Sequence, residues 1–445
     1  MKTIGSILVW AAAALALAAA PARAHPMPRT HVLLDLDARG ITAELQLPMN
    51  ELEMGYQHPF LDDPRGRIAQ YHDSLVAYIG HHVGLVSPDG RAWWVDVSPD
   101  LEVTTQDRVP TLVAHLRMLP PDGAPVRRFT LQYDVIQHQL ITHRSLVAVR
   151  HDWDGGAVAG PPNVLAEIGY PTPTLVVDLP PGSAWRGFAS VVRLGMRHIA
   201  EGTDHLLFLL VLLLPAALVP LRGTLVSGRA DSRWGGYAGV RPSVRYLVRV
   251  VTAFTLGHSL TLAAGAVGLL RLPSRPVETL IALSILVSAL HALKPLFAGR
   301  EALVSGGFGL VHGLAFASVV AEFGLDPWHL TLSILGFNVG IELMQLTVVA
   351  VAVPWLLVLA RTRAYAFVRV PGAVVAGAAA VAWMLERALG WANPVGPRVE
   401  AVAAHPAWIV GALAGAAVVA TLVDARRAPT PPPAARSVSS PLPSL

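Results

Sequence analysis

Long apolar runs in the second half of the chain constrain its fold more than any other feature. From Phe188 onward the sequence holds successive apolar segments of about 18 residues or more, each long enough for a helix to cross a bilayer. The predicted spans are residues 190–220, 246–270, 277–297, 302–322, 330–358, 370–389 and 404–423. We therefore predict an α-helical membrane bundle of about seven transmembrane helices.

The composition agrees with a membrane protein and excludes several other classes. Hydrophobic residues make up 53% of the chain and charged residues only 14%, which is too apolar for an ordinary soluble enzyme. Cysteine is absent, which rules out disulfides, thiolate metal sites and cysteine nucleophiles. The net charge is +4, but the arginines fall in loops and form no basic face, so we expect no nucleic-acid partner.

Positive residues in alternate loops predict the orientation of the spans. They are Arg222, Arg229, Arg233, Arg241, Arg245, Arg300, Arg361, Arg363, Arg426 and Arg427. The opposite loops carry Glu322 and Asp326, or mixed charges. Because positive loops stay in the cytoplasm, the carboxyl terminus is predicted there, with the chain in a bacterial inner (plasma) membrane.

The two ends of the chain have the sequence patterns of a signal peptide and of a disordered tail. Residues 1–24 combine Lys2, an apolar stretch and Ala22-Arg23-Ala24, which is typical of a secretory signal peptide with cleavage before His25. This independently predicts that the following domain lies in the periplasm. Residues 426–445 are rich in proline and serine and are predicted to be a disordered cytoplasmic tail.

Residues 25–185 contain no spanning run and show alternating segments separated by turns. The predicted strands are residues 30–37, 41–47, 92–97, 111–118, 128–135, 145–150 and 174–179, with a helix over 64–83. We expect an N-terminal β-rich, sandwich-like extracytoplasmic domain, mostly antiparallel, followed by the transmembrane domain over residues 186–425.

The strongest candidate site opens the first predicted span. His198, Glu201 and His205 fall at i, i+3 and i+7 of a helix and share a face, with Asp204 at its edge. Two imidazoles with one or two carboxylates suit a divalent first-row metal. The structural alternative is that these residues only cap the helix at the membrane interface. We favour metal or proton handling because ionisable groups at membrane depth usually serve a function.

Further polar residues lie inside otherwise apolar spans. His258 and His312 occupy the second and fourth spans, and Asn338 and Glu342 share a face of the fifth. A buried carboxylate is costly unless it is paired, protonated or bound to a cation. Each also has a structural reading, in which it hydrogen-bonds a neighbouring helix. We predict that these four residues line a metal path.

A second candidate site lies outside the membrane. Cleavage after Ala24 exposes His25, whose α-amine and ring nitrogen can bind one metal ion, and Met27 and His31 follow closely. This is an expected outer capture site for copper or nickel.

The membrane half resembles the HupE/UreJ family of nickel and cobalt permease-like proteins. The family pattern H-x-x-x-G-x-D-H is matched by His198, Gly202, Asp204 and His205. Three more motifs follow in order: Phe254-Thr255-x-x-His258-Ser259, Phe308-Gly309-Leu310-x-His312-Gly313 and Phe337-Asn338-x-Gly340-x-Glu342. The β-rich front half looks like the branch of the family that adds an extracytoplasmic domain.

The resemblance implies a metal substrate, and at one position this sequence departs from the family pattern. It implies nickel or cobalt, whereas the residues alone indicate a borderline divalent cation, with zinc or copper also suited. The better-known permeases carry a second histidine shortly after His-Gly of the fourth span, and Phe316 lies near that place here.

Three functions compete on the sequence. The first is a divalent metal permease or permease-like metal-binding protein, with the lipid bilayer, the metal ion and a periplasmic protein as partners. The second is an intramembrane zinc hydrolase, which a three-histidine cage around one point would favour. The third is a non-transporting assembly or sensor protein. The usual hydrolase and nucleotide-binding motifs are absent from the sequence, so a transporter is favoured over an enzyme.

Overall fold

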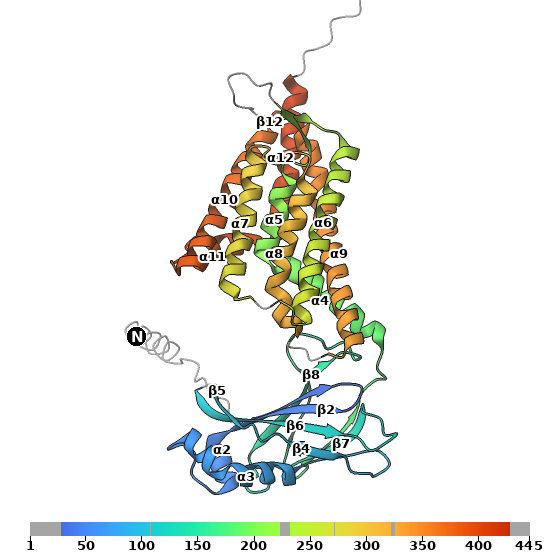
Figure 1. Cartoon of the computed structure of the whole chain (residues 1–445), viewed down its shortest axis with the longest axis vertical. Helices are drawn as coiled ribbons and strands as arrows, with labels where there is room; N and C mark the ends of the chain where they lie inside the picture. Colours follow the sequence, from blue (N-terminus) through green and yellow to red (C-terminus); the bar gives the residue numbers. More distant parts are fainter. Residues whose placement is uncertain (1–27, 107, 223–231, 271, 322–324, 428–445) are drawn as a thin grey trace, which may run out of the picture. The chain divides into compact units, whose positions relative to one another are not determined.

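The computed structural model describes residues 28–106, 108–222, 232–270, 272–321 and 325–427, leaving aside the side chains of 222, 232, 317–321 and 427. The chain divides into two compact units, Met1–Ala184 and Trp185–Leu445. The predicted signal peptide, with His25 and Met27, and most of the predicted tail lie outside the described residues. Each unit is considered separately below (Figure 1).

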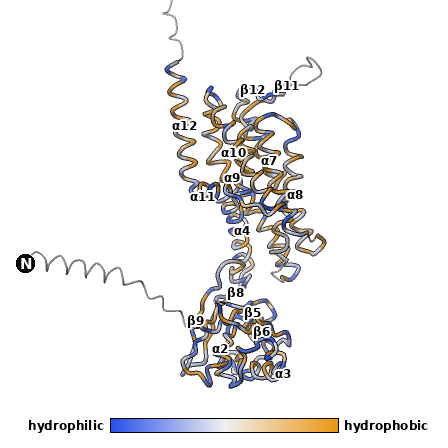
Figure 2. The backbone as a smooth tube through the Cα atoms, turned by 90° about the vertical axis from the view of Figure 1, so that its left-hand side faces the viewer, coloured by the Kyte–Doolittle hydropathy of each residue, from blue (hydrophilic) through white to orange (hydrophobic). Residues whose placement is uncertain are grey.

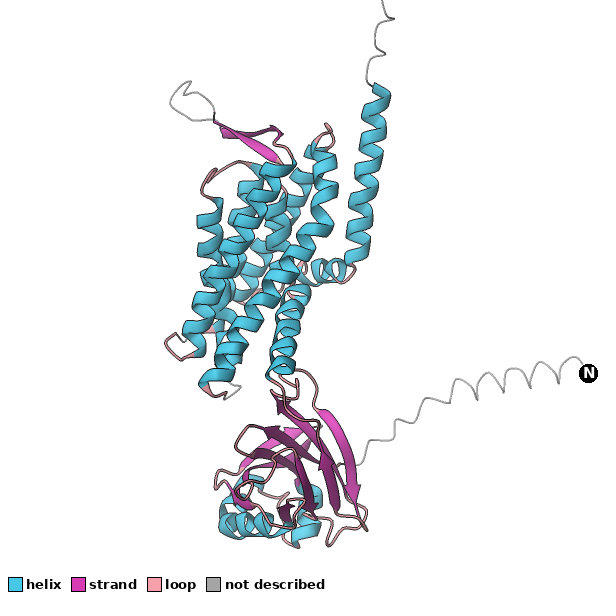
Figure 3. Ribbon diagram, turned by 90° about the vertical axis from the view of Figure 1, so that its right-hand side faces the viewer, coloured by secondary structure: helices cyan, strands magenta, loops and turns pink. Residues whose placement is uncertain are grey.

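The first unit, which we call the β unit, contains two sheets. Its strands are β1 (Thr30–Leu36), β2 (Ile41–Pro48), β3 (Val83–Val86), β4 (Trp94–Val97), β5 (Glu102–Gln106), β6 (Val109–Leu119), β7 (Arg128–Tyr133), β8 (Arg144–Asp152), β9 (Asn163–Gly169) and β10 (Thr174–Asp178). The larger sheet runs β4-β6-β2-β1-β8-β9, with β5 also paired to β6, and the smaller runs β10-β7-β3. All pairings between these strands are antiparallel except β1 with β8, which is parallel (Figure 3).

One hydrophobic core lies between the sheets. Alternation along β1 buries Val32 and Leu34, while Leu131 and Phe129 of β7 enter the same cluster from the smaller sheet. The N-terminal region is thus β-rich, as predicted. The sequence patterns missed β3, β5 and β9, which are short or lack clean alternation.

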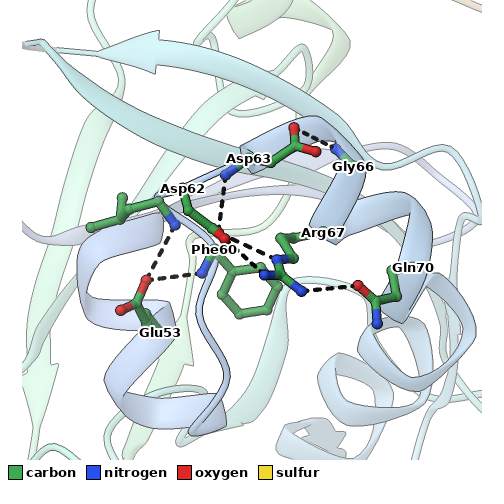
Figure 4. A network of polar contacts seen from close by, with 8 residues as sticks. Glu53, Phe60, Asp62, Asp63, Gly66, Arg67 and Gln70 are labelled. Atoms are coloured by element: carbon green, nitrogen blue, oxygen red, sulfur yellow. Dashed lines mark hydrogen bonds and ion pairs between the residues drawn. The ribbon is translucent and has the colours of Figure 1, made fainter.

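The described residues of the β unit also form helices α2 (Met49–Tyr56) and α3 (Pro64–His82). Asp63 caps α3 because its side chain accepts a hydrogen bond from the backbone N–H of Gly66. Glu53 of α2 accepts from the backbone N–H groups of Phe60 and Leu61 and so fixes the connecting loop (Figure 4). The helix predicted over 64–83 is therefore present, and its start is set by local hydrogen bonds.

Buried polar groups tie strands of the β unit together. Arg150 on β8 forms ion pairs with Asp35 of β1 and Glu44 of β2. Deeper inside, the His143 ring lies between the carboxylate of Glu51 and the hydroxyl of Thr30, which is 2.8 Å from Nε2. Each of these buried groups thus has a partner, as a stable core requires.

The second unit, which we call the helical unit, is mostly helix. Its elements are α4 (Ala184–Glu201), α5 (Thr203–Leu213), β11 (Leu218–Arg222), β12 (Ser232–Tyr237), α6 (Val240–Ala266), α7 (Ser274–Leu293), α8 (Glu301–Ala321), α9 (Pro327–Ala360), α10 (Tyr365–Leu389), α11 (Gly396–Ala403) and α12 (Pro406–Arg427). The long helices are apolar over most of their length (Figure 2). Many of their large apolar side chains face outward, as expected of a surface that contacts lipid.

Five described helices are long and apolar enough to cross a membrane: α6, α7, α9, α10 and α12. Two shorter apolar helices are α5 and the segment Glu301–Phe316 of α8. The five long helices agree with five of the predicted spans. The count of seven stays a prediction, because it needs both shorter helices to cross as well.

The first predicted span is not one continuous helix, contrary to the sequence prediction over 190–220. Gly202 adopts an extended conformation, with φ −76° and ψ 93°, between the end of α4 and the start of α5. A β-hairpin of β11 and β12 then follows α5. Glycine relieves the steric restraints on φ and ψ, and here it interrupts the helical periodicity on which we had placed His198, Glu201 and His205.

Candidate metal centre

The break at Gly202 brings two histidines together. His198 lies in the last turn of α4, and His205 lies in the first turn of α5. Their ring centroids are 4.7 Å apart. A Cβ atom on Gly202 would lie 2.7 Å from the His198 carbonyl oxygen and 2.9 Å from His205 Nδ1. Glycine is therefore needed here because of close approach.

A third histidine joins this pair from another helix. His258 of α6 has its ring centroid 6.3 Å from that of His198. One ligand nitrogen from each of His198, His205 and His258 can be chosen so that all lie within 4.8 Å of one another. His205 and His258 are buried and His198 is partly buried. Among the described residues, these three form the candidate metal centre.

A fourth histidine lies beside the centre. The ring centroid of His312, on α8, is 4.9 Å from that of His205. The Ser284 hydroxyl oxygen lies 2.7 Å from the Ile281 carbonyl oxygen and 2.9 Å from His312 Nε2, so a hydroxyl that donates to the carbonyl accepts its second bond from Nε2–H. In that tautomer Nδ1 of His312, which has no partner among the described residues, carries a lone pair that suits a metal ligand or a relay position.

Asp204 fixes the orientation of His205. Its Oδ1 accepts hydrogen bonds from the backbone N–H of His205, at 2.9 Å, and from ring Nδ1, at 3.0 Å. Because an ionised carboxylate only accepts, Nδ1 carries the hydrogen and Nε2 keeps its lone pair. A carboxylate behind a histidine is the usual support for a metal ligand in proteins.

Several ring nitrogens of this cluster have no hydrogen-bond partner among the described residues. They are His198 Nε2, His205 Nε2, both nitrogens of His258 and His312 Nδ1. Buried polar atoms without a partner cost free energy of the order of 1–3 kcal/mol each, and hydrocarbon offers no compensating water. Unpaired imidazole nitrogens that converge from four helices fit a bound cation, so the residues present suit a divalent metal with imidazole ligands.

Close helix packing places these histidines. A Cβ on Gly309 of α8 would lie 2.1 Å from the Phe254 carbonyl oxygen of α6, and one on Gly257 would lie 2.1 Å from the Gly306 carbonyl oxygen. A Cβ on Gly340 of α9 would meet the Val192 carbonyl oxygen of α4 at 2.1 Å. Glycines therefore let the helix backbones touch, as small residues commonly do in membrane helices.

Aromatic rings close one side of the centre. Phe316 and Phe337 stack with centroids 4.4 Å apart and an interplanar angle of 5°. The His198 ring lies 4.9 Å from Phe316 and 5.3 Å from Phe337. Phe316 and Phe337 thus contact the centre through His198.

The other predicted site residues lie outside the three-histidine group. Glu201 is exposed, and its carboxylate is 3.8 Å from Arg197. Glu342 accepts a hydrogen bond of 2.8 Å from Thr252 on α6, which matches the structural reading considered for it. Asn338 donates to the Ile334 carbonyl oxygen, and its own Oδ1 has no partner among the described residues. His31 lies on β1 of the β unit.

A cavity opens beside the centre on the side of Asp204. Its volume is about 720 Å³, and its polar lining includes Glu201, Asp204, Arg387 and Glu400. The carboxylates on this wall outnumber the single guanidinium, which is the balance that attracts a cation. Sequence reasoning missed Glu400, Arg387 and Ser284 because no local motif links them to the histidines.

The bundle and its centre define the class of protein. Apolar outward-facing helices around buried histidines and a carboxylate describe a membrane protein with a candidate metal centre. Residues 176–387 match the model of a family described as HupE / UreJ protein, so this segment of the chain belongs to the HupE/UreJ family. A search of curated proteins finds no match. The family supports a role in metal transport, or an accessory role, in general terms.

Proposed function

We propose that this chain is a permease, or permease-like binding protein, for a divalent transition metal of the nickel or cobalt type. The observation that carries the proposal is the convergence of unpaired imidazole nitrogens from His198, His205 and His258 inside a membrane bundle. The metal is substrate, so it must bind and then leave. Neutral imidazoles with few carboxylates give a site of modest charge, which suits release.

The structure supports a sequence of contacts for the ion. The cation enters the cavity beside Asp204 and Glu201, whose carboxylates attract it. His198, His205 and His258 then replace part of its water shell. The ring centroid of His312 lies 4.9 Å from that of His205, and His312 Nδ1 is the next ligand. Asn338 and Glu342 of α9 line the continuation of the path.

The proposed topology has seven spans, with α4 and α5 together forming the first and α8 the fourth. The loop charges then place the β unit in the periplasm and the carboxyl terminus in the cytoplasm of a bacterial inner membrane. In this arrangement the exported β unit captures metal or binds a periplasmic protein, and His25, Met27 and His31 form an outer capture site after cleavage of the signal peptide.

Metal content and uptake together test the proposal. We would compare the wild type with the variant His198→Ala/Asp204→Ala/His205→Ala, measuring bound metals in detergent by mass spectrometry and radioactive nickel and cobalt uptake in cells. Glu386→Gln is the matched control, because this exposed carboxylate on α10 accepts a hydrogen bond from Asn393 and lines neither the centre nor the cavity. Uptake that disappears in the folded triple variant and persists in the control supports transport.

The three-histidine group also favours a second function, an intramembrane zinc hydrolase. Catalytic zinc commonly takes three protein ligands and one water, and three imidazole nitrogens within 4.8 Å fit that pattern. Ser259, which follows His258 on α6, donates its hydroxyl hydrogen to the Thr255 carbonyl oxygen and so adds nothing to such a site. Tightly held stoichiometric zinc with no uptake of nickel or cobalt would reject transport and lead to assays of lipid amides and esters.

The assembly or sensor function makes a separate prediction for the β unit. If deleting this unit abolishes the cellular phenotype while the helical unit still takes up metal, the β unit is the functional module. If uptake and phenotype fall together after substitution of the histidines, the permease proposal holds.

A further inference from the structure

Helix α4 carries a stripe of arginines on the face opposite its buried face. Arg186, Arg193 and Arg197 lie at i, i+7 and i+11, which places them within about 40° of one another around the helix. All three residues are exposed. The buried residues of α4 lie on the other side and are Gly187, Val191, Gly195 and Ile199. The arginine stripe therefore faces away from the rest of the helical unit.

The positive charge of this stripe is only partly offset. Glu201 is the only acidic residue in the sequence of α4. Its carboxylate lies 3.8 Å from Nε of Arg197, and the two side chains are 73% and 59% exposed. This distance is longer than a hydrogen bond, and an exposed ion pair contributes little. The terminal nitrogens of the Arg197 guanidinium therefore stay available, and the outer face of α4 is positively charged.

The chemistry of the stripe excludes hydrocarbon as its surroundings. An arginine held in the hydrocarbon core of a bilayer is costly, and its long side chain extends toward the interface where it can. Among the described helices, α4 is not one of those that are long and apolar enough to cross a membrane. The three guanidinium groups of α4 therefore lie where lipid headgroups or water reach them.

Two exposed tryptophans mark the same end of α4 and of its neighbour α9. Phe188 lies against Gly336, and the next turn of α4 lies against the next turn of α9, so the two helices run in the same direction. Trp185 lies in the first turn of α4 and is 73% exposed, while Trp328 lies in the first turn of α9 and is 62% exposed. Tryptophan is enriched where headgroups meet hydrocarbon. The arginine stripe thus begins beside a membrane interface.

We propose that the face of α4 formed by Arg186, Arg193 and Arg197 binds the phosphate groups of anionic phospholipids. Arg193 and Arg197 lie one turn apart, about 6 Å along the helix axis, so both can reach one phosphate. The planar fork of N–H donors on a guanidinium matches phosphate oxygens. Arg186 lies about 10 Å further along the axis and reaches a neighbouring headgroup. Net positive charge selects anionic lipids over zwitterionic ones.

This surface is separate from the candidate metal centre. His198 of α4 contacts Phe316, Phe337 and the other histidines of the bundle, whereas the arginine stripe faces outward. The proposal needs only that the helical unit lies in a bilayer. It does not depend on which metal the centre binds or on whether that metal is transported.

The test measures lipid binding by the full chain purified in a neutral detergent. Native mass spectrometry counts the bound lipid molecules during titration with phosphatidylglycerol, whose headgroup is anionic, or with phosphatidylcholine, whose headgroup has a phosphate but no net charge. The test variant is Arg186→Gln/Arg193→Gln/Arg197→Gln, which removes the charge of the stripe and keeps side chains of similar length.

The matched control removes the same charge from the β unit. It is Arg39→Gln/Arg65→Gln/Arg117→Gln, three exposed positions outside the helical unit. A change of net charge by itself affects both variants equally, so a difference between them reports the α4 surface.

The wild type and the control should bind phosphatidylglycerol more tightly than phosphatidylcholine. In the test variant the affinity for phosphatidylglycerol should fall about 10-fold or more, because each arginine near an anionic headgroup adds several-fold to binding. Its affinity for phosphatidylcholine should stay unchanged. Added salt should weaken phosphatidylglycerol binding to the wild type much more than to the test variant, since salt screens exposed charges.

The proposal is overturned if the test variant keeps the lipid preference of the wild type, or if the control loses that preference equally. Inorganic phosphate that displaces phosphatidylglycerol from the wild type at millimolar concentration would show a site for the free anion, which also overturns the lipid assignment. Melting curves show whether the variants fold. Should the test variant fail to fold, Arg186→Gln and Arg193→Gln are compared singly, and an unchanged preference in both overturns the proposal.

Discussion

At the scale of single residues, Asp204 holds His205 in the tautomer whose Nε2 is available to the proposed metal. Asp204→Asn keeps the shape of the side chain but removes its charge and lets its amide nitrogen take the place of the accepting oxygen. We predict that the affinity for the proposed metal falls about 10- to 100-fold, as for other supporting carboxylates. Competition with a chromogenic chelator in detergent measures this change.

Glu386→Gln serves as the control for this prediction, because the exposed Glu386 carboxylate contacts Asn393 and not the histidines or the cavity. Equal affinities for wild type and Asp204→Asn would show that the Asp204 carboxylate does not support the metal ligand.

At the scale of helices, the contact of α6 with α8 depends on glycine. Gly309→Leu would force a side chain into the Phe254 carbonyl oxygen, which a Cβ alone approaches to 2.1 Å. We expect the helices to separate, with about 1–3 kcal/mol or more of lost stability and loss of metal binding at His258 and His312. Thermal unfolding in detergent, followed by size-exclusion chromatography, measures the loss.

Gly307→Leu provides a matched control on the same helix, since a Cβ there would meet nothing within 4 Å. If both variants unfold at the same temperature, close packing at Gly309 is not what holds α6 against α8.

At the scale of strands, Arg150 of β8 ties β1 and β2 together and makes stability depend on pH. Burial by itself raises the pKa of Asp35, but hydrogen bonds from His151 and Arg150 hold it below its usual value. Burial likewise raises the pKa of Glu44, and hydrogen bonds from Arg150 and Gln46 lower it. The unfolded chain binds these protons at about pH 4, so the stabilisation is complete above that pH and is lost as the pH falls through the folded pKa values.

We predict that Arg150→Leu makes the β unit unfold at a higher pH than wild type during acid titration. Limited proteolysis of the full chain at a series of pH values reports this unfolding. The comparison variant is Arg128→Leu, whose ion pair with Asp178 is exposed on both sides. An identical acid midpoint in Arg150→Leu and wild type would contradict the prediction.

At the scale of the whole molecule, seven spans require the two ends of the chain to lie on opposite sides of the membrane. We predict that a fluorescent protein fused after Leu445 glows in the cytoplasm and that alkaline phosphatase fused after Ala184 is active outside it. A fusion of alkaline phosphatase after Leu445 is the control and should be inactive. Phosphatase activity at Leu445 would mean an even number of spans.

The sequence by itself determined the class of the molecule and which polar residues lie within its apolar segments. Apolar runs of spanning length can only be satisfied by helices in lipid, because every backbone polar group needs a partner there. Alternation predicted most strands of the β unit, and Pro64 followed by a helical pattern predicted α3. Four ordered motifs around His198, His258, His312 and Glu342 were enough to indicate the family, which the match over residues 176–387 supports.

Only the tertiary structure decided which of these residues meet. A helical pattern fixes the face of a side chain but not which helix packs against that face, so His258 could be joined to His198 only through the packing of α6. The same packing gave Glu342 a hydrogen bond from Thr252. The extended Gly202 separated Glu201 from the two histidines with which it had shared a predicted face. Periodicity is a local property, whereas a metal centre built from several helices depends on backbone breaks and close contacts that the local pattern does not contain.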